Sequence, residues 1–369
     1  MKRCTPLAAL ACLLLGFAAQ AEDSKQLTLL VTGDNRGELA QCGCSHLPAG
    51  GLARRKVVVE QERARGPVLL LDAGNALFKE QTRDEAAKVK AAFILETMGK
   101  LRTAAMTVGL MDLVAGPEFL KSTAKKANVK VLSANLTQNG KKLFEPSAVM
   151  TQGALRIGVV GVGPAFASLE GHPGLVGTPP IPAAVAEARK LEGKVDVVVV
   201  LAALPLDDVL QLSKEAGESV DLIFHSSDSK RPTVPRRDYS SFLISTGQRG
   251  QLVVDVKLDL SGEGPLLDAA DLPRAEQTLA LLEQQVAEAR RHLAATQDPA
   301  RQRSYQESLK GLEERKAQVR ATLEGLRGRT GRGLSLSTIP LGPGVVDDPV
   351  LKAQVEKLEP PGSVTYDKP

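Results

Sequence analysis

The sequence has few aromatic residues and few histidines. It contains no tryptophan, three tyrosines, eight phenylalanines and four histidines, and its formal net charge is +4. Nucleic-acid-binding surfaces combine dense positive charge with stacking aromatics, so this composition gives no support for nucleic acid as a partner. Beyond the first 21 residues there is no apolar run of the roughly 20 residues that a membrane-spanning helix needs. We therefore expect no stable membrane insertion.

Cysteine is also scarce, and two of the four cysteines lie in a segment with the features of a secretion signal. Lys2 and Arg3 precede an apolar run at 7–17, and Ala19-Gln20-Ala21 stands before two acidic residues. This order is typical of a signal peptide that is cleaved after Ala21. The sequence therefore predicts residues 1–21 as a signal peptide and a periplasmic or secreted mature protein.

The mature chain then retains a single local pair of cysteines, Cys42 and Cys44, separated by Gly43. A disulfide between them would close a very short ring, which constrains the unfolded chain little. Three interpretations are open: a clip within the loop, a thiol-redox site or, with His46, a metal-ligating loop. Because strained, exposed disulfides are the labile ones, we single out Cys42 and Cys44 as redox candidates.

Short β-branched runs alternate with amphipathic stretches over 27–259, which predicts an α/β domain with partly parallel sheets. The run Val197–Leu201 is continuously apolar, as expected of a strand buried on both faces. The sequence predicts strands at 27–32, 68–72, 105–108, 129–133, 157–162, 195–201, 220–224, 242–246 and 252–258. It predicts helices at 52–64, 84–101, 117–127, 182–191 and 206–216.

The pattern changes after residue 262. From Leu272 to Gly328, apolar residues recur at spacings of three and four, interrupted at Lys316 and at Asp298-Pro299. This spacing predicts a hairpin of two antiparallel helices at 271–329, appended to an α/β domain at 22–262. An arm packed on its own domain and a partner-binding or self-associating arm both fit. Residues 330–369 are expected to form one strand, one short helix and a Pro-rich tail.

Several segments of the α/β region resemble the calcineurin-like metallophosphoesterases, and most of all the periplasmic 5'-nucleotidases. The matching segments are 29–37, 50–55, 69–75, 131–136, 156–162 and 245–250. The resemblance implies a four-layer α/β/β/α sandwich. It also implies a site at the carboxyl ends of the strands, where two metal ions activate water for attack on a phosphoester.

The metal-binding motifs of that family are only partly present. Asp34 matches the first motif, but Arg36 stands where a histidine is expected, and Asn75 replaces the aspartate that bridges the metals. In the third motif Leu110 and Met111 replace the metal-binding asparagine and the histidine that acts on the transition state. No histidine follows the strand at 195–201.

The resemblance leaves vestigial metal positions at Asp34, Asn75, Asp112 and His225, although His225 stands about two places early. Asp34, Asn75 and Asp112 with Asp228 form an alternative, single-metal set, and His225 could be a lone ligand. Arg36 puts a fixed positive charge where a cation should bind, so we expect no cofactor. Manganese, zinc or magnesium is expected only if an altered metal site is active.

The Cys-Gly-Cys loop and the following Gly-Gly-Leu-Ala-Arg-Arg resemble a side branch of the family in secreted bacterial proteins. Members carry a cysteine or selenocysteine pair there and a Gly-x-x-Asp-Leu segment, which 109–113 matches. Neighbouring cations lower the pKa of a thiol. We therefore predict that Arg36, His46, Arg54 and Arg55 form a ligand-binding neighbourhood around the thiols.

The sequence thus favours a 5'-nucleotidase-like protein without two-metal hydrolysis, whose Cys-Gly-Cys loop has a thiol-redox role with a periplasmic protein partner. An active phosphoesterase with an altered metal site is the main alternative. A non-catalytic scaffold that uses the helical hairpin is a third.

Overall fold

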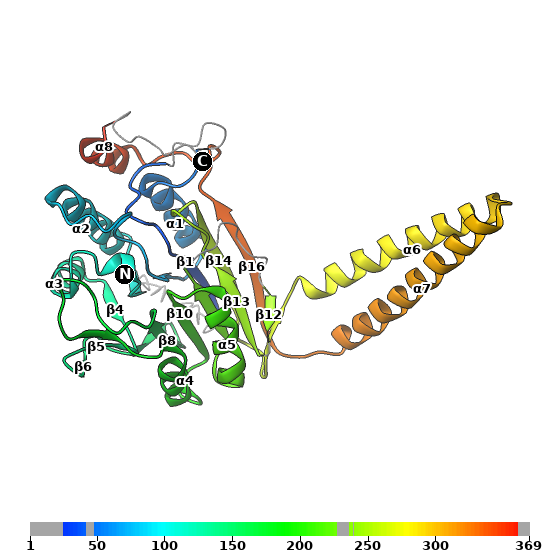
Figure 1. Ribbon diagram of the computed structural model, residues 1–369, viewed down its shortest axis with the longest axis horizontal. Helices are drawn as coiled ribbons and strands as arrows, with labels where there is room; N and C mark the ends of the chain where they lie inside the picture. The colour runs from blue at the N-terminus through cyan, green and yellow to red at the C-terminus, as the bar shows by residue number, and fades with distance from the viewer. Residues whose placement is uncertain (1–24, 42–47, 227–235, 239, 361–369) are drawn as a thin grey trace, which may run out of the picture.

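The computed structural model describes residues 25–41, 48–226, 236–238 and 240–360. Two β-sheets stack face to face, and helices cover the outer surface of each (Figure 1). This arrangement confirms the predicted four-layer α/β/β/α sandwich. Across the described residues, none of the helices combines the length and the apolar character needed to span a bilayer.

Among the described residues the first sheet has seven strands, and the four from β1 to β4 run parallel to one another. Its spatial order is β15 (Leu266–Asp268), β16 (Arg332–Pro340), β14 (Leu252–Asp259), β1 (Gln26–Thr32), β2 (Val68–Asp72), β3 (Thr103–Thr107) and β4 (Lys130–Leu132). The outer surface is covered by α1 (Leu52–Arg65), α2 (Glu85–Lys100) and α3 (Pro117–Ala127), and α8 (Pro349–Leu358) packs against α1.

The second sheet has six strands in the described part of the chain, and β8, β10, β11 and β13 run parallel. Its order is β12 (Arg236–Asp238), β13 (Ser241–Ser245), β11 (Leu222–His225), β10 (Val197–Ala202), β8 (Leu155–Val162) and β7 (Ser147–Gln152). Helices α4 (Pro180–Leu191) and α5 (Leu206–Ala216) cover it. A small third sheet contains β6 (Lys141–Lys142), β5 (Leu136–Gln138) and β9 (Leu175–Gly177).

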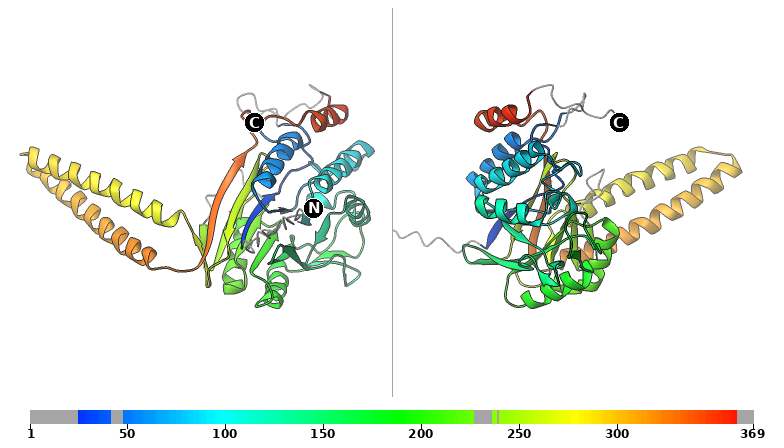
Figure 2. Two further views of the ribbon diagram at one scale, coloured as in Figure 1. Left: turned by 180° about the vertical axis from the view of Figure 1, so that it is seen from behind. Right: turned by 60° about the vertical axis from the view of Figure 1, so that its left-hand side comes forward.

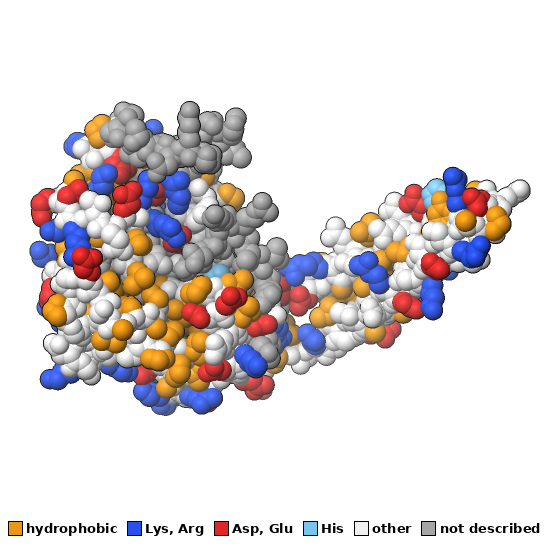
Figure 3. Space-filling model, viewed as in Figure 1, with side chains coloured by type: hydrophobic (Ala, Val, Ile, Leu, Met, Phe, Trp, Pro, Cys, Tyr) orange, Lys and Arg blue, Asp and Glu red, His pale blue; other side chains and the backbone are white. Residues whose placement is uncertain are grey.

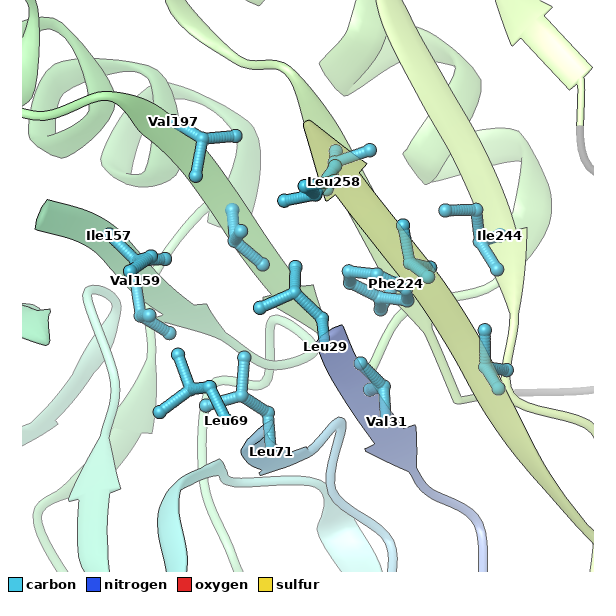
Figure 4. Close-up of a cluster of buried hydrophobic side chains, with 14 of the residues drawn as sticks. Leu29, Val31, Leu69, Leu71, Ile157, Val159, Val197, Phe224, Ile244 and Leu258 are labelled. Carbon is cyan, nitrogen blue, oxygen red and sulfur yellow. The ribbon is translucent and has the colours of Figure 1, made fainter. Parts of the chain in front are cut away.

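The largest core lies between the two main sheets. Leu29 on β1 and Leu69 on β2 of the first sheet lie in one buried cluster with Phe224 on β11 of the second sheet (Figure 4). Every residue of β10 is buried, because the second sheet packs on the first sheet with one face and on α4 and α5 with the other. The continuous apolar run that predicted this strand is explained by these two contacts.

Helix ends follow capping rules that are readable in the sequence. The Asp84 side chain accepts the N–H of Ala87 at 2.7 Å, and Asp348 accepts that of Leu351 at 2.7 Å. Helix α3 begins with a proline and ends at Asn128, which adopts the left-handed conformation. The predicted bounds of α3 and α5 match the structure, and for α3 the initial proline and the terminal Asn128 are such signals.

The predicted helical hairpin is present as α6 (Asp271–Ala295) and α7 (Pro299–Arg327), and it projects away from the α/β body in each view (Figures 1 and 2). Three ion pairs link the helices at seven-residue intervals: Arg290–Glu313, Glu283–Arg320 and Glu276–Arg327, at 2.6, 2.7 and 3.1 Å. Basic and acidic side chains mix along the arm (Figure 3).

The hairpin is an insertion rather than an appendage, which corrects the predicted domain boundaries. After α7 the chain returns as β16, which pairs antiparallel with β14 along its whole length and parallel with β15. Leu351 and Val355 of α8 then join the buried cluster that also contains residues of α2 and α3. The α/β domain therefore includes residues from both sides of the hairpin, and 330–360 is not a separate tail.

Candidate functional site

Parallel strands of both sheets end at one edge, and the loops that follow them meet there. Asp34 and Arg36 follow β1, Asn75 follows β2, Asp112 follows β3 and His225 ends β11. Hydrogen bonds tie these loops together: the N–H of Asp34 donates to Gly74 O at 2.8 Å, and that of Arg36 donates to Asn75 O at 3.0 Å. The predicted convergence of these segments is thus present in the structure.

Asp34 and Arg36 form an ion pair. The Arg36 Nε lies 2.8 Å from Asp34 Oδ1, and the carboxyl side chain is 1% exposed while that of Arg36 is 42% exposed. Both residues have positive φ, 50° and 48°, so the loop turns sharply and brings the two side chains to the same side. A fixed guanidinium charge therefore neutralises the one carboxylate that matches the family's first motif.

Asn75 links three strand ends through its side-chain amide. Its Nδ2 donates to Ser226 O at 2.7 Å, and its Oδ1 accepts the N–H of Met111 at 3.3 Å. A Cβ at Gly109 would lie 2.0 Å from that oxygen, so only glycine fits at that position. The amide is used for bonds within the protein, and its role in the structure is to hold the loops together.

Asp112 is enclosed by backbone amides. One carboxylate oxygen accepts the N–H groups of Gly109 and Asn75 at 2.8 and 2.7 Å, and the other accepts those of Ala76 and Leu77 at 2.8 and 3.1 Å. The residue is fully buried, and burial raises the pKa of Asp112 to about 7 against the effect of these bonds. We therefore revise its interpretation as a vestigial metal position: the carboxylate organises the loop after β2.

Arg54 and Arg55 also point into the protein rather than toward a ligand. Arg54 donates to Pro48 O and Leu341 O at 2.8 and 2.9 Å and is 6% exposed. Arg55 is 2% exposed and donates to Asn35 Oδ1, and burial lowers its pKa more than nearby Asp72 raises it. We therefore revise the prediction that these two arginines bind a ligand. Their hydrogen bonds instead connect α1 to the surrounding loops.

His225 differs from the other site residues because its ring makes no hydrogen bond within the described residues. Both Nδ1 and Nε2 are buried without a partner, and the residue is 1% exposed. Burial lowers the pKa of His225 to about 4, so the imidazole is neutral at pH 7. By strand alternation from Phe224, which faces the other sheet, its side chain lies on the face covered by α5.

Cys42, Cys44, His46 and Asp228 lie outside the described residues, so their predicted roles stay predictions. Both ends of the Cys-Gly-Cys loop are anchored: the N–H of Leu52 donates to Leu39 O at 2.9 Å, and Gln41 Nε2 donates to Asp347 Oδ2 at 3.3 Å. The loop thus starts and ends beside α1, a few residues after the Asp34–Arg36 pair.

The chain is similar to proteins of one family, although no family model matches it. A curated 5'-nucleotidase of Vibrio cholerae serotype O1 is 29% identical over 168 residues, which are 43% of this chain and 29% of the relative. The solved 5'-nucleotidase precursor of Thermus thermophilus covers 90% of this chain and 58% of its own, with a TM-score of 0.59 and 19% identity. The match to a calcineurin-like phosphoesterase of Bacillus subtilis covers 63% of this chain and 84% of the phosphoesterase chain, with a TM-score of 0.53 and 17% identity.

The α/β domain has the fold of the calcineurin-like phosphoesterases and 5'-nucleotidases, and its sequence is similar to part of a curated 5'-nucleotidase. The matched region spans about three tenths of the length of the curated relative, so the activity of the whole relative is not assigned to this chain.

The residues at the strand ends do not fit the two-metal centre that the family implies. Such a centre needs several carboxylate and imidazole donors around adjacent cations. Here Asp34 is paired with Arg36, the Asn75 amide is used internally, and Leu110 and Met111 supply no hard donor. Within the described ranges, no group of three or more His, Cys, Asp or Glu side chains is arranged to hold a metal ion.

Sequence reasoning missed three polar residues at this 5'-nucleotidase-like site: Asp72, Glu38 and Arg249. Asp72 is fully buried and accepts Thr32 Oγ1 at 2.6 Å and the N–H of Gly74 at 2.9 Å, and burial raises its pKa. Arg249 donates Nε and Nη2 to Glu38 Oε1 at 2.9 and 2.6 Å. Asp72 and Arg249 lie within the segments that carry the family resemblance, and that resemblance could have drawn attention to them.

Proposed function

We propose that this is a periplasmic or secreted 5'-nucleotidase-like protein whose strand-end site does not hydrolyse phosphoesters with two metals. The single observation that carries this proposal is the 2.8 Å ion pair between Arg36 and Asp34. A cation at Asp34 would have to displace a guanidinium that is always charged, and the internal bonds of Asn75 would have to break as well.

The second part of the proposal is that Cys42 and Cys44 carry out thiol–disulfide exchange with a protein partner. A partner dithiol attacks the Cys42–Cys44 disulfide through a mixed disulfide. The partner leaves as a disulfide, and its two electrons remain here as two thiols. The isolation of this pair in the mature sequence supports the proposal.

The localisation is part of the proposal and depends on the predicted signal peptide. The Thermus thermophilus relative is described as a precursor, which is compatible with export. An oxidising compartment is also where a disulfide of this kind persists.

A second candidate function is a phosphoesterase with an altered site that holds one manganese, zinc or magnesium ion. The observation that favours it is His225, a neutral imidazole whose two nitrogens have no partner among the described residues. Its weakness is the lack of neighbouring donors in the same part of the chain.

Purified mature protein separates these candidates. We expect no stoichiometric metal after incubation with manganese, zinc or magnesium, and no turnover of AMP or a generic phosphoester. Turnover that is abolished by Asp34→Ala but not by Ser337→Ala, on the outer face of β16, would establish the second candidate instead. Equilibration in glutathione buffers should titrate two thiols, and Cys42→Ser should abolish the transition. Thiols that stay unreactive would end the redox proposal.

A further inference from the structure

A basic groove lies at the opposite end of the first sheet from the strand-end site. It has a volume of about 750 Å³ and is lined by the starts of β3 and β4, the last turns of α2 and α3, and the segment 143–145. Ligand-binding clefts typically have volumes of about 300–1,000 Å³. These elements lie on the side of the body away from the helical hairpin (Figure 1).

The charge of this groove is one-sided. Its exposed lining carries four cations, Arg102, Lys121, Lys125 and Lys130, against one carboxylate, Glu145. In the described part of the chain none of these four cations forms an ion pair, whereas other lysines of the body, such as Lys56, Lys90 and Lys142, do. Arg63 adds a fifth positive charge nearby, since it donates to Leu101 O at 2.5 Å, and burial together with the charge of Arg102 lowers its pKa.

Helix electrostatics account for only part of this charge. Lys125 lies in the last turn of α3, where a cation stabilises the carboxyl end of a helix. Lys121 is in the middle of that helix, Lys130 starts a strand and Arg102 lies in the loop before β3. Their clustering around one groove therefore has no explanation in the stability of α3.

The floor of the groove is apolar and recessed. Val129 and Val131 are 5% and 9% exposed, and Leu143 and Phe144 are partly buried beside them. None of the large exposed apolar side chains of the described residues lines the groove. A membrane-binding surface presents apolar side chains outward, so this arrangement suits a chain that inserts side chains into the groove.

The strand that lines the groove is the last strand of its sheet. β4 pairs with β3 on one side, and Lys130 and Val131 belong both to this strand and to the groove. On the other side Leu132 is bridged to Glu145, and the N–H of Ser133 donates to Glu145 O at 2.9 Å, so the segment 143–145 already lies along part of this edge. An extended ligand is therefore recognised mainly through its alternate side chains, which meet the cations and the apolar floor.

We propose that this groove binds an extended, acidic segment of a partner protein, in which acidic side chains alternate with apolar ones. The acidic side chains pair with the four cations, and the apolar side chains fill the floor between Val131 and Phe144. The site is independent of the thiol loop and of any hydrolytic chemistry.

A short fluorescein-labelled peptide of alternating Glu and Leu tests this with the full mature chain, by fluorescence anisotropy. We expect saturable binding that weakens with salt, and a loss of at least about tenfold in affinity for Lys121→Glu/Lys125→Glu. A peptide of alternating Glu and Gly should bind more weakly because the floor stays unfilled, and one of alternating Lys and Leu should not bind. The double change Lys121→Gln/Lys125→Gln provides a milder variant if charge reversal impairs folding.

The matched control is the double change Lys214→Glu/Lys310→Glu on α5 and α7, which makes the same change in charge at exposed helical positions away from the groove. Equal loss of affinity in the control and in the groove variants would overturn the proposal, because binding would then reflect net charge alone. Cosedimentation with phosphatidylglycerol vesicles together with no binding of the Glu-Leu peptide would overturn it in favour of a membrane surface.

Discussion

Asn75 and Ser226 clamp the two main sheets together at their carboxyl ends. The Asn75 Nδ2 donates to Ser226 O at 2.7 Å, and the Ser226 hydroxyl donates back to Ala73 O in the same loop. Two reciprocal bonds thus join the loop after β2 to the end of β11 where the family would place metal ions.

Replacing this amide with the family's carboxylate should weaken the fold. Asn75→Asp places a carboxylate oxygen against the Ser226 carbonyl, and we expect a loss of about 2 kcal/mol in the free energy of unfolding. Urea denaturation measures it. Asn139→Asp is the control, since Asn139 is exposed and has a similar φ of 49° against 56° for Asn75. Recovery of stability on adding manganese to Asn75→Asp would contradict the absence of a metal site.

The buried His225 should make stability depend on pH in a defined direction. Because its folded pKa of about 4 lies below the unfolded value of 6.5, the unfolded chain binds the proton more readily. The contribution is complete above pH 6.5 and is lost as the pH falls toward 4, to the extent of about 3 kcal/mol.

The variant His225→Leu removes this dependence, so the wild-type protein should lose stability relative to the variant as the pH falls from 6.5 to 4. At pH 7 the variant should be as stable as the wild type or slightly more so, since no hydrogen bond of the ring is lost. Denaturation at several pH values measures both effects. His292→Gln on α6 is the control, because that ring is already exposed. A large loss of stability at pH 7 would show that His225 has a partner.

Asp112 should be among the most sensitive polar positions. Asp112→Ala leaves four buried N–H groups without an acceptor, and we expect a loss of about 3 kcal/mol or more. Asp207→Ala, on the exposed first turn of α5, should cost well under half as much. Similar effects for the two variants in thermal denaturation would argue against the assigned structural role.

The hairpin should be dispensable for the sandwich. Replacing 271–329 by a flexible Gly/Ser linker should leave the α/β body folded, because α6 and α7 contact mainly each other. Circular dichroism should report a loss of helix, and the unfolding of the remainder should stay cooperative. An insoluble product would show that the arm takes part in the core.

Much of the fold could be predicted because its signals are local. Val68–Asp72 and Pro117–Ala127 were predicted with their observed bounds, since short apolar runs, N1 prolines and cap residues act within a few positions. The strands β5, β6 and β9 were missed because each has only two or three residues and pairs only within a small sheet. The return of β16 beside β14 was also missed, because hydrophobic periodicity does not specify strand pairing.

The position of the site could be predicted from the sequence, but the hydrogen-bond partners of its residues could not. That the loops after β1, β2, β3 and β11 meet follows from parallel strand ends and from the family resemblance. The residue types of Asp112, Arg54 and Arg55 suggested ligand binding, yet their partners are mostly backbone groups brought in by folding. The sequence does not show such partners.

The place of the arm has a consequence for how the protein folds. β14 and β16 are distant along the chain, and closing a long flexible segment is slow and costs entropy. A helical hairpin forms from contacts between near neighbours, and the Glu276–Arg327 pair brings its two ends together. Once α6 and α7 have paired, their adjacent ends leave only a few flexible residues between β15 and β16. The arm thus holds β15 and β16 close together during folding. Substitutions that weaken the pairing of α6 with α7 should therefore slow the formation of the first sheet, even if the folded protein is equally stable.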